Sequence, residues 1–435
     1  MSIIISFLLI GLVLGAIACG APLFTIIGGG AALLFKFVAD GKIAFILTDM
    51  KKVMTAPGII SIPLFVFAGF IFAESKSSTR LIKLSDALIG WMPGGLAVVT
   101  VMVSTVFTAL TGGSGVTIIA CGGILLPALI KNHYDDDFSL GLVTSAASSG
   151  VLFIPSLPII IYGVIAEVDV SLLFIAATIP AILIMMILVL YGIYYGAKTK
   201  VPTTPFSVQN LLESLWEIKW VLPLPIIVIG GIYGGFITVS EAASATVVYA
   251  LITECLIYQE IPAKQLVIVA IKSMRTVGAI LMVLVAALGL TSFMVDQDIP
   301  QMAVDFISEA ITNKYVFLLC LNAILLVVGC LMDIFSAIVV MVPLIKPMAE
   351  QFGIDPLHLG VIFLANLTVG YITPPVGMNL FISSLRFKAP VIRLYRVVVP
   401  ALILLLITLA LITYIPWLST FLVQAFGLQK EAIIL

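Results

Sequence analysis

The chain has 435 residues, of which 62% are hydrophobic and 10% are charged, whereas an ordinary soluble domain contains about 25% charged residues. This composition excludes a water-soluble globule, because no such protein needs so much apolar surface. The formal net charge of −1 gives no basic surface that would argue for nucleic acid as a partner.

Long stretches without charge predict an all-α polytopic membrane protein that crosses the bilayer about ten or more times. The run from Val277 to Val295 approaches the roughly 20 apolar residues that one crossing needs. Candidate spans lie near residues 3–38, 57–73, 94–131, 139–166, 170–197, 219–236, 240–259, 266–294, 315–331, 335–349, 358–385 and 397–424. Several are too long for one pass and contain Gly or Pro, so we expect re-entrant or broken helices there.

The N-terminal segment lacks Lys and Arg before its apolar run, which distinguishes it from a cleavable signal peptide, so we interpret it as a retained first span.

Charged residues near the spans indicate the orientation only at one place. The densest basic cluster has no acid among its members, and the positive-inside rule places its loop in the cytoplasm. Its members are Arg386, Lys388, Arg393 and Arg396.

The five cysteines lie inside apolar segments and show no paired spacing for a metal. We interpret them as small buried thiols. They are Cys19, Cys121, Cys255, Cys320 and Cys330.

A polar segment at residues 198–219 separates two apolar halves of the chain. Ser207 is predicted to cap a short amphipathic helix over residues 208–219. We expect this helix to lie along the membrane surface. Its apolar face contains Leu211, Leu212, Leu215 and Trp216.

Unusual features recur in the same order on both sides of this linker. The first half contains Thr-Gly-Gly-Ser-Gly-Val-Thr at 111–117, Leu-Leu-Pro at 125–127 and Ile-Pro-Ser-Leu-Pro at 154–158. The second contains Met-Asp-Ile-Phe-Ser at 332–336, Leu-Ile-Lys-Pro at 344–347 and Thr-Pro-Pro-Val-Gly at 373–377. Pro127 matches Pro347 at an offset of 220, or Pro343 at a different one, and Pro155 matches Pro374 at 219. Helix-breaking sites at corresponding positions of two halves indicate a transporter built from repeats.

The breaks supply groups that bind ions. A broken helix frees about four N–H groups at one new end and four C=O groups at the other. Helix N-termini attract anions, whereas carbonyl and hydroxyl oxygens suit Na⁺. Because the breaks contain no Arg or Lys, an anionic substrate would be held mainly by N-termini and hydroxyls. The alternative is that the hydroxyls bond freed backbone or pack between helices. The candidate oxygen donors are the hydroxyls of Thr111, Ser114, Thr117, Ser336 and Thr373 and the carbonyls of Gly112, Pro155 and Pro374.

Asp333 lies well inside an apolar stretch, where an acid is costly and usually functional. We expect it to coordinate a cation or orient a helix, and the alternative is a cap for the helix that follows. Glu241 follows Thr238 at an expected helix start, which favours a structural first-turn role. Asn366 and Asn379 flank the break at 373–375, where each is expected to bond freed backbone or contact substrate.

Together, these motifs resemble the large membrane subunit of tripartite ATP-independent periplasmic (TRAP) transporters over essentially the whole chain. They are Gly-Gly-Ser-Gly-Val-Thr at 112–117, Ile-Pro-Ser-Leu-Pro at 154–158, Ile-Tyr-Gly at 161–163, Met-Asp at 332–333, Gly-Ile-Asp-Pro-Leu-His at 353–358 and Thr-Pro-Pro-Val-Gly at 373–377. The resemblance implies an inverted-repeat, elevator-type transporter of the bacterial inner membrane, with two re-entrant helical hairpins and broken helices. It also implies Na⁺-driven uptake of a small organic acid anion, a carboxylate or a sulfonate. The implied partners are a small four-helix membrane subunit, a periplasmic substrate-binding protein and membrane lipid.

The resemblance also assigns residues to the sites. It places Ser114 and Thr117 at the first hairpin and Asp333 and Ser336 at the second. The candidate Na⁺ residues are Thr111, Gly112, Ser114, Thr117, Pro155, Asp333, Ser336, Thr373, Pro374 and Gly377. The candidate substrate-binding residues are Ser114, Ser156, Thr373 and Asn379. The chain departs from the family pattern at Gly113, where members often have a serine, and at Ser148-Ser149-Gly150, where they often have a Gly-rich stretch.

The expected organisation alternates scaffold and repeat. It comprises N-terminal scaffold spans at 1–56, a first repeat at 57–197, the amphipathic linker at 198–219, further scaffold spans at 220–294, a second repeat at 295–425 and a C-terminal tail at 426–435.

Two alternatives stay open at this point. One is a self-sufficient Na⁺/organic-anion carrier that works without a binding protein. The other is an intramembrane serine protease, since Gly112-Gly113-Ser114-Gly115 matches its Gly-x-Ser-Gly motif. The protease reaction needs a His base on a facing helix, and neither His133 nor His358 lies deep in a predicted span, so we expect no enzyme.

Overall fold

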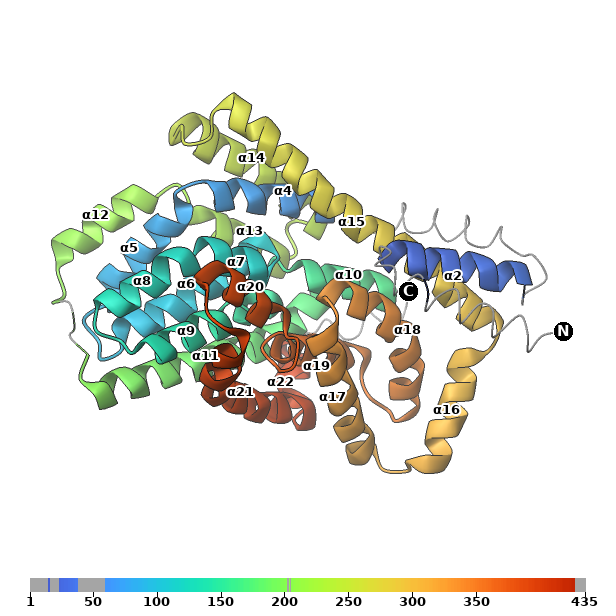
Figure 1. The fold of residues 1–435 in the computed structure, drawn as a ribbon. Helices are drawn as coiled ribbons and strands as arrows, with labels where there is room; N and C mark the ends of the chain where they lie inside the picture. Colours follow the sequence, from blue (N-terminus) through green and yellow to red (C-terminus); the bar gives the residue numbers. More distant parts are fainter. Residues whose placement is uncertain (1–14, 16–22, 38–58, 202, 204, 427–435) are drawn as a thin grey trace.

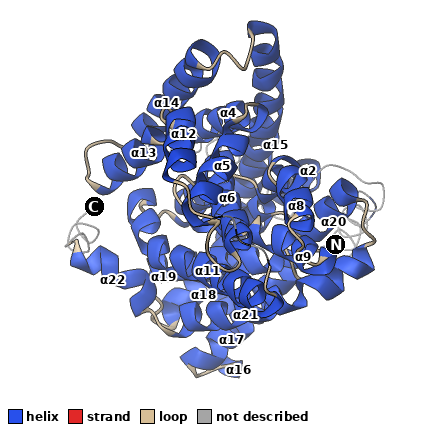
Figure 2. Cartoon of the chain, turned by 90° about the vertical axis from the view of Figure 1, so that its left-hand side faces the viewer, coloured by secondary structure: helices blue, strands red, loops and turns tan. Residues whose placement is uncertain are grey.

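The computed structural model describes residues 15, 23–37, 59–201, 203 and 205–426. Every regular element in these ranges is a helix (Figures 1 and 2). This follows from the apolar composition, because a helix satisfies its backbone polar groups within its own segment. The predicted scaffold at 1–56 is described only at Gly15 and in α2 (Leu23–Phe37), and the tail at 427–435 lies outside the described residues.

Six described helices are long and apolar enough to cross a bilayer. They are α11 (Val170–Thr199), α14 (Val239–Ala250) with its π-helical continuation η2 (Leu251–Ile257), α15 (Ala263–Asp296), α17 (Lys314–Leu331), α18 (Ile334–Gln351) and α21 (Val391–Tyr414).

Three bent pairs raise the count of candidate spans to nine. The pair α7 (Ser114–Ala120) and α8 (Gly122–Lys131) bends by 50°, and α12 (Val208–Ile218) and α13 (Pro223–Tyr233) by 68°. The third joins α9 (Asp136–Ala146) and its 3₁₀ turn η1 (Ser149–Leu152) to α10 (Leu157–Ala166) with a bend of 44°. The all-α polytopic class is confirmed. The described residues give fewer passes than the ten or so expected, because apolar helices such as α4 (Ser61–Glu74), α6 (Gly95–Thr111) and α19 (Pro356–Gly370) are short.

Two series of helices follow the same order. The first comprises α6, α7–α8, α9, α10 and α11, and the second comprises α17, α18, α19, α20 (Met378–Phe387) and α21. Asp135 caps α9 and Asp355 caps α19 exactly one repeat later, at an offset of 220, and each carboxylate accepts two backbone N–H bonds. The two halves therefore share the helix order that a repeat implies, and the bounds of the two repeats stay a prediction.

The helix register corrects the proline matches. Pro127 lies in α8 and Pro347 lies in α18, so their offset of 220 is the same as that of the two capping aspartates. The residue that corresponds to Pro155 at this offset is Pro375, not Pro374 as predicted. Each break contains a cis peptide bond, at Ile154-Pro155 and at Pro374-Pro375.

Two connecting helices were not predicted from the sequence. They are α5 (Ser77–Ile89), which precedes α6, and α16 (Ile299–Ala310), which precedes α17 at the corresponding place of the second series. The α5 helix packs against α6 and α12, and α16 packs against α18. Their sequences mix charged and apolar residues, so a search for uncharged spans passes over them.

The predicted amphipathic helix is confirmed as α12. The Ser207 hydroxyl accepts a bond from the Asn210 N–H at 3.3 Å. Leu212 and Trp216 are exposed, whereas Leu211 is half-buried. The exposed apolar face and the bend of 68° toward α13 fit a helix at the membrane surface.

The helices of the two series interlock. The α10 helix packs against α18 of the second series, and α20 packs against α7 of the first. The long helix α11 contacts α6, α19, α21 and the C-terminal α22 (Trp417–Ala425). Outside them, α4 packs against α14 and α15, and α15 packs against α2, along the top of the molecule in Figure 1.

A buried ion cluster joins α5 to the end of η2. The Arg80 guanidinium is 2.5 Å from Glu260 and 3.8 Å from the fully buried Glu254 carboxylate. The Ser77 hydroxyl donates to Glu254 at 2.8 Å, and the guanidinium lies 3.7 Å from the Tyr258 ring centroid. These contacts fix the start of α5 against η2 and the residues that follow it.

Candidate functional site

The first hairpin is formed by α6 and by α7 with α8, and its tip is at Gly112 and Gly113, between α6 and α7. Gly112 has a φ of +70°, and a Cβ there would lie 2.4 Å from Leu157 Cδ1. The break that follows α9 lies against α6. The Thr108 hydroxyl donates to the Ala147 carbonyl at 2.7 Å, and a Cβ on Gly150 would lie 2.2 Å from the Thr105 carbonyl. Small residues therefore allow the first break to pack on the hairpin.

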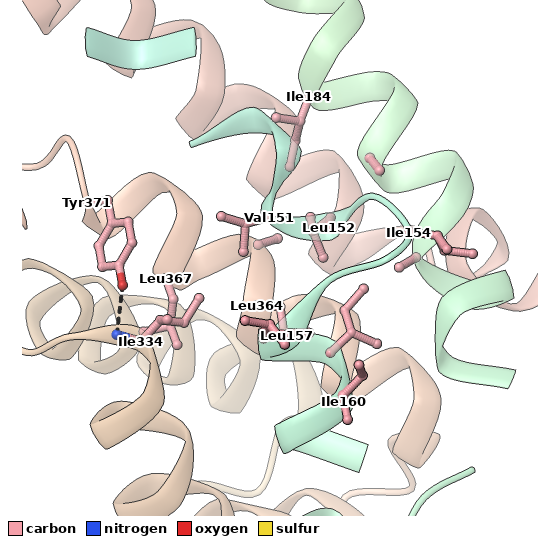
Figure 3. Close-up of a cluster of buried hydrophobic side chains, with 14 of the residues drawn as sticks. Val151, Leu152, Ile154, Leu157, Ile160, Ile184, Ile334, Leu364, Leu367 and Tyr371 are labelled. Atoms are coloured by element: carbon pink, nitrogen blue, oxygen red, sulfur yellow. Dashed lines mark hydrogen bonds between the residues drawn. The ribbon is translucent and has the colours of Figure 1, made fainter. Parts of the chain in front are cut away.

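The second hairpin ends at Met332 and Asp333 and holds the break between α19 and α20. The Tyr371 hydroxyl accepts a bond from the Ile334 N–H at 2.8 Å (Figure 3). The Gly377 N–H donates to the Cys330 carbonyl at 2.9 Å. The hairpin and the broken helix thus each satisfy one backbone N–H of the other, as burial at membrane depth requires.

The two series meet at α20, which crosses α7 and α9. The Ser114 hydroxyl donates to the Asn379 amide oxygen at 2.7 Å. The Thr144 hydroxyl donates to Ser383 at 2.9 Å, and the Asn379 amide donates to the Thr144 carbonyl at 3.4 Å. All four side chains are buried. Two predicted substrate-binding residues from opposite halves are therefore in direct contact.

Figure 3 shows the apolar packing between the breaks. Leu157 of α10 lies beside Leu364 of α19, and Leu367 of α19 lies beside Ile334 at the start of α18. The end of the first break therefore packs on the helix that leads into the second.

Most of the other predicted hydroxyls donate to nearby backbone or to each other. Thr111 donates to the Phe107 carbonyl at 2.8 Å, Thr373 donates to the Val369 carbonyl at 2.9 Å, and Ser156 donates to the Val151 carbonyl. The hydroxyls of Thr117 and Thr108 are 2.6 Å apart. These bonds use the hydroxyl protons but leave oxygen lone pairs, which are what a cation binds.

The predicted carbonyl ligands have no donors. Within the described ranges, no hydrogen bond reaches the carbonyls of Gly112, Pro155 or Pro374. Each belongs to a hairpin end or a break, where the helical partner is missing. Their oxygens therefore have lone pairs available for a ligand or water.

Ser145 is a site residue that the sequence analysis missed. Its hydroxyl is buried in the last turn of α9 and has no hydrogen-bond partner among the described residues. Burying an unpaired hydroxyl costs about 1–3 kcal/mol. The signal in the sequence was the group of hydroxyls at Thr144-Ser145 and Ser148-Ser149, just before the first break. Tyr371 and Thr108 were missed as well, because only the tertiary structure brings them to the hairpins.

Asp333 caps α18. Its carboxylate accepts the N–H groups of Phe335 at 3.0 Å and Ser336 at 3.1 Å, and also the Ser336 hydroxyl. The capping alternative thus describes its contacts, and a role toward a cation stays a prediction. Glu241 has the expected structural role, because it forms a capping box with Thr238 at the start of α14.

The two asparagines differ in surroundings. Asn379 lies in the site, whereas Asn366 donates to Asn322 at 2.7 Å and to the Ile362 carbonyl at 2.8 Å. The Asn366 amide N–H groups therefore bond a neighbouring helix and its own helix instead of the freed backbone. Its amide oxygen is buried without a partner among the described residues, and a contact with substrate stays a prediction.

In the described part of the chain, the Ser114 hydroxyl bonds Asn379 and neither histidine. His358 is buried with Nδ1 2.6 Å from the Ser419 hydroxyl and Nε2 3.3 Å from the Thr413 carbonyl, while His133 is exposed after α8. Four of the cysteines are described, and Cys121 and Cys330 are the buried ones. No group of three or more His, Cys, Asp or Glu residues that could hold a metal occurs in the described part of the chain.

Comparison with known proteins decides the family. The family model "Tripartite ATP-independent periplasmic transporter, DctM component" matches residues 9–418. The chain belongs to this DctM family. It is 30% identical to the C4-dicarboxylate TRAP transporter large permease DctM of Vibrio cholerae, over 95% of this chain and 96% of that protein. It is 33% identical to the isethionate TRAP transporter permease DctMQ of Oleidesulfovibrio alaskensis, over 95% of this chain but 64% of that longer protein.

As a DctM permease, the chain is a multi-pass protein of the bacterial inner membrane and not an enzyme, so the protease alternative is rejected. Among solved structures, the YdaH transporter of Alcanivorax borkumensis aligns with a TM-score of 0.61 at 13% identity, over 88% of this chain and 90% of that one. This structural likeness supports a membrane-transporter fold.

Proposed function

We propose that this DctM permease catalyses Na⁺-coupled secondary active uptake of a small organic acid anion, a carboxylate or a sulfonate. The observation that carries the proposal is the pair of hairpin ends and helix breaks, which bring hydroxyls and unbonded carbonyls together at the junction of two repeats. Named relatives transport C4-dicarboxylates and isethionate, which are anions of these classes.

The donor set fits Na⁺ as the coupling ion. The first break offers the unpaired Ser145 hydroxyl and the Pro155 carbonyl, and the first hairpin offers the Gly112 carbonyl. Neutral oxygens of this kind suit a hard monovalent cation, whereas soft metals select thiolates and imidazoles. The second break, with Asp333 beside it, would supply a second set of oxygen donors, and this set includes one negative charge.

The substrate position would lie at the contact of Ser114 with Asn379. Both side chains are polar, buried and contributed by different repeats. An anion that displaces their mutual hydrogen bond would accept hydrogen bonds from the Ser114 hydroxyl and the Asn379 amide N–H groups. Thr373 and Ser156 lie at the two breaks and complete the candidate set.

The contacts between the repeats support an elevator mechanism. The Ser114–Asn379 bond ties the hairpin of the first repeat to the broken helix of the second, and the Thr144–Ser383 bond ties the two broken helices to each other. Movement of one repeat alone would break these buried bonds, whereas movement of both as one body against α4, α14 and α15 preserves them. We therefore favour transport by a single moving body.

Two partners would complete the transporter. The family name describes a tripartite system, and the DctMQ relative is longer than this chain. We propose a small four-helix membrane subunit beside this permease and a periplasmic binding protein that delivers the substrate.

The test is uptake into proteoliposomes that contain this chain and its small partner subunit. Labelled succinate, isethionate and sialic acid are supplied with and without an inward Na⁺ gradient and the cognate binding protein. Uptake of one anion that needs both supports the proposal. Na⁺-driven uptake without the binding protein would favour the self-sufficient carrier, and no uptake under any gradient would contradict Na⁺ coupling.

Ser145 offers a direct test of the ion site. If its hydroxyl binds Na⁺, Ser145→Ala raises the Na⁺ concentration that gives half-maximal uptake. If the hydroxyl is only an unsatisfied polar group, Ser145→Ala raises the melting temperature and leaves the Na⁺ dependence unchanged. The matched control is Ser148→Ala, because the Ser148 hydroxyl donates to the Ser145 carbonyl at 3.0 Å and has its partner.

A further inference from the structure

Two cavities adjoin α5, where this helix meets the linker helix α12 and the base of the first hairpin. The larger has a volume of about 320 Å³ and is lined by α5, α12 and the residues just before α12. The smaller has a volume of about 200 Å³ and is lined by α5, the start of α6 and the end of α8. The α5 and α12 helices lie side by side at the left of Figure 1. Lys83 and Asp86 line both cavities.

The Asp86 carboxylate faces these cavities without a partner. It is half-buried, and within the described ranges no hydrogen bond or ion pair reaches it. Lys83, one turn earlier on α5, does not compensate it, because its ammonium pairs with Glu217 of α12 at 2.8 Å. Burial accordingly raises the pKa of the Asp86 carboxyl. A carboxylate withdrawn from water without a partner is costly, and a cation bound beside it would offset that cost.

The larger cavity carries an excess of negative charge. Its lining contains three carboxylates, those of Asp86, Glu213 and Glu217, and one ammonium, that of Lys83. Once Lys83 and Glu217 are paired, two negative charges remain. Glu213 accepts only a neutral bond, from the Gln209 amide at 3.0 Å. This balance disfavours an anion and favours a ligand with positive charge.

The lining suits an organic cation better than a metal ion. No group of three or more His, Cys, Asp or Glu residues in the described part of the chain is arranged to hold a metal. A volume of 320 Å³ is that of about ten water molecules in the liquid. Trp91 and Phe206 also line the cavity, and aromatic rings attract ammonium groups but supply no oxygen ligands.

The cavities lie on the face that the positive-inside rule assigns to the cytoplasm. Tyr134 lines the smaller cavity, and Asp137, three residues later, pairs with Arg393 of the basic cluster at 2.6 Å. The surface helix α12 forms one wall of the larger cavity. A ligand can therefore come from the cytoplasm or from lipid headgroups at the membrane surface.

We propose that the cavity between α5 and α12 binds a primary alkylammonium group that pairs with the Asp86 carboxylate. A small cytoplasmic diamine and the ethanolamine headgroup of a membrane lipid both carry such a group. The site is separate from the candidate ion and substrate positions, and it does not depend on the proposed uptake function. A ligand bound there bridges the linker helix and α5, which leads into the first hairpin.

The experiment is equilibrium binding of labelled putrescine, a diammonium, to the purified full-length protein in detergent. Butanol serves as the uncharged competitor and Mg²⁺ as the metal competitor. We expect saturable binding that unlabelled putrescine displaces and that neither competitor displaces at the same concentration. Because no Na⁺ gradient is used, the result is independent of transport.

Four variants test the position of the site. Asp86→Asn should raise the Kd for putrescine about tenfold or more, as for the loss of a charged hydrogen bond. Ala87→Leu fills the larger cavity without changing its charge and should abolish binding. Ala128→Leu fills the smaller cavity and should leave the Kd within about twofold. Asp136→Asn is the matched control, because Asp136 is exposed and lines neither cavity.

Two membranes distinguish the sources of the ammonium group. The same binding is measured in nanodiscs of phosphatidylethanolamine and of phosphatidylglycerol, with the binding by empty discs subtracted. Putrescine binding that is lost only in phosphatidylethanolamine identifies the lipid headgroup as the occupant. Equal binding in both membranes identifies a soluble amine.

Three results would overturn the proposal. They are an absence of saturable putrescine binding in detergent, an equal loss of binding in Asp86→Asn and Asp136→Asn, and displacement by Mg²⁺ as strong as that by putrescine. The second would indicate a general effect of charge, and the third would assign the cavity to a metal ion. If Asp86→Asn does not fold, Ala87→Leu decides, because unchanged binding there refutes the cavity as the site.

Discussion

The hydroxyl of Ser114 donates to the amide oxygen of Asn379 across 265 residues of chain, at 2.7 Å. Ser114 begins α7 in the first repeat, and Asn379 lies in the first turn of α20 in the second. The bond therefore joins the hairpin of one repeat to the broken helix of the other at the candidate substrate position.

A double-mutant cycle on this pair should show a favourable interaction. Ser114→Ala and Asn379→Ala each remove one partner and leave the other buried. We expect a coupling free energy of about 0.6 to 1.7 kcal/mol, the range for buried hydrogen bonds in membrane helices. Thermal unfolding of the purified protein measures it. Ser244→Ala is the control, because Ser244 is exposed and donates only to a carbonyl of its own helix. Strictly additive losses would show that the bond contributes nothing.

Asp333 can be tested for capping and ion binding separately. Asp333→Asn keeps an oxygen that accepts the N–H groups of α18, whereas Asp333→Ala removes the cap and should lower the stability by about 1 kcal/mol. If the charge also serves Na⁺, Asp333→Asn should insert normally but lose Na⁺-coupled uptake. Asp355→Asn is the matched control, because Asp355 caps α19 in the same manner. Normal uptake by Asp333→Asn would leave capping as its role.

Gly150→Ala should disrupt the first break. The added Cβ would meet the Thr105 carbonyl at 2.2 Å and the Ala109 nitrogen at 2.9 Å, and backbone atoms cannot rotate away. We expect a loss of stability of about 1–3 kcal/mol, as for overpacking of a core, and strongly reduced uptake. Gly278→Ala is the control, since nothing lies within 4 Å of the added Cβ on α15. Melting temperature and uptake together check this, and a fully active Gly150→Ala protein would show that the break is not packed this tightly.

The buried ion cluster at the start of α5 makes a further prediction. Arg80→Leu leaves the Glu254 carboxylate buried without its guanidinium, and its side chain is 0% exposed. We expect a loss of about 3–5 kcal/mol, the usual effect of breaking a buried pair. Arg80→Leu combined with Glu254→Leu should recover much of that loss, because the fully buried charge of Glu254 is then removed and only the partly exposed Glu260 lacks its partner. The measurement is thermal unfolding. A double variant no more stable than Arg80→Leu would contradict this electrostatic explanation.

The sequence by itself determined the helical class, the approximate positions of the spans and the order of the breaks. It also determined the caps, because Ser207 and Glu241 act within a few residues of their own position. These features depend on local hydrophobicity, on helix-breaking residues and on short-range hydrogen bonds, all of which are written in consecutive residues. The repeat was visible for the same reason, since helix-breaking prolines recur at nearly the same offset in the two halves.

The tertiary structure alone decided which residues meet. Nothing local distinguishes Asn379, which contacts Ser114, from Asn366, which bonds Asn322 instead. The packing of α5 against α12, of α16 against α18 and of α20 against α7 likewise becomes visible only in the folded chain. Such contacts arise from packing between segments that are far apart in the chain, by more than 200 residues for Ser114 and Asn379. Composition and spacing along the chain do not encode them.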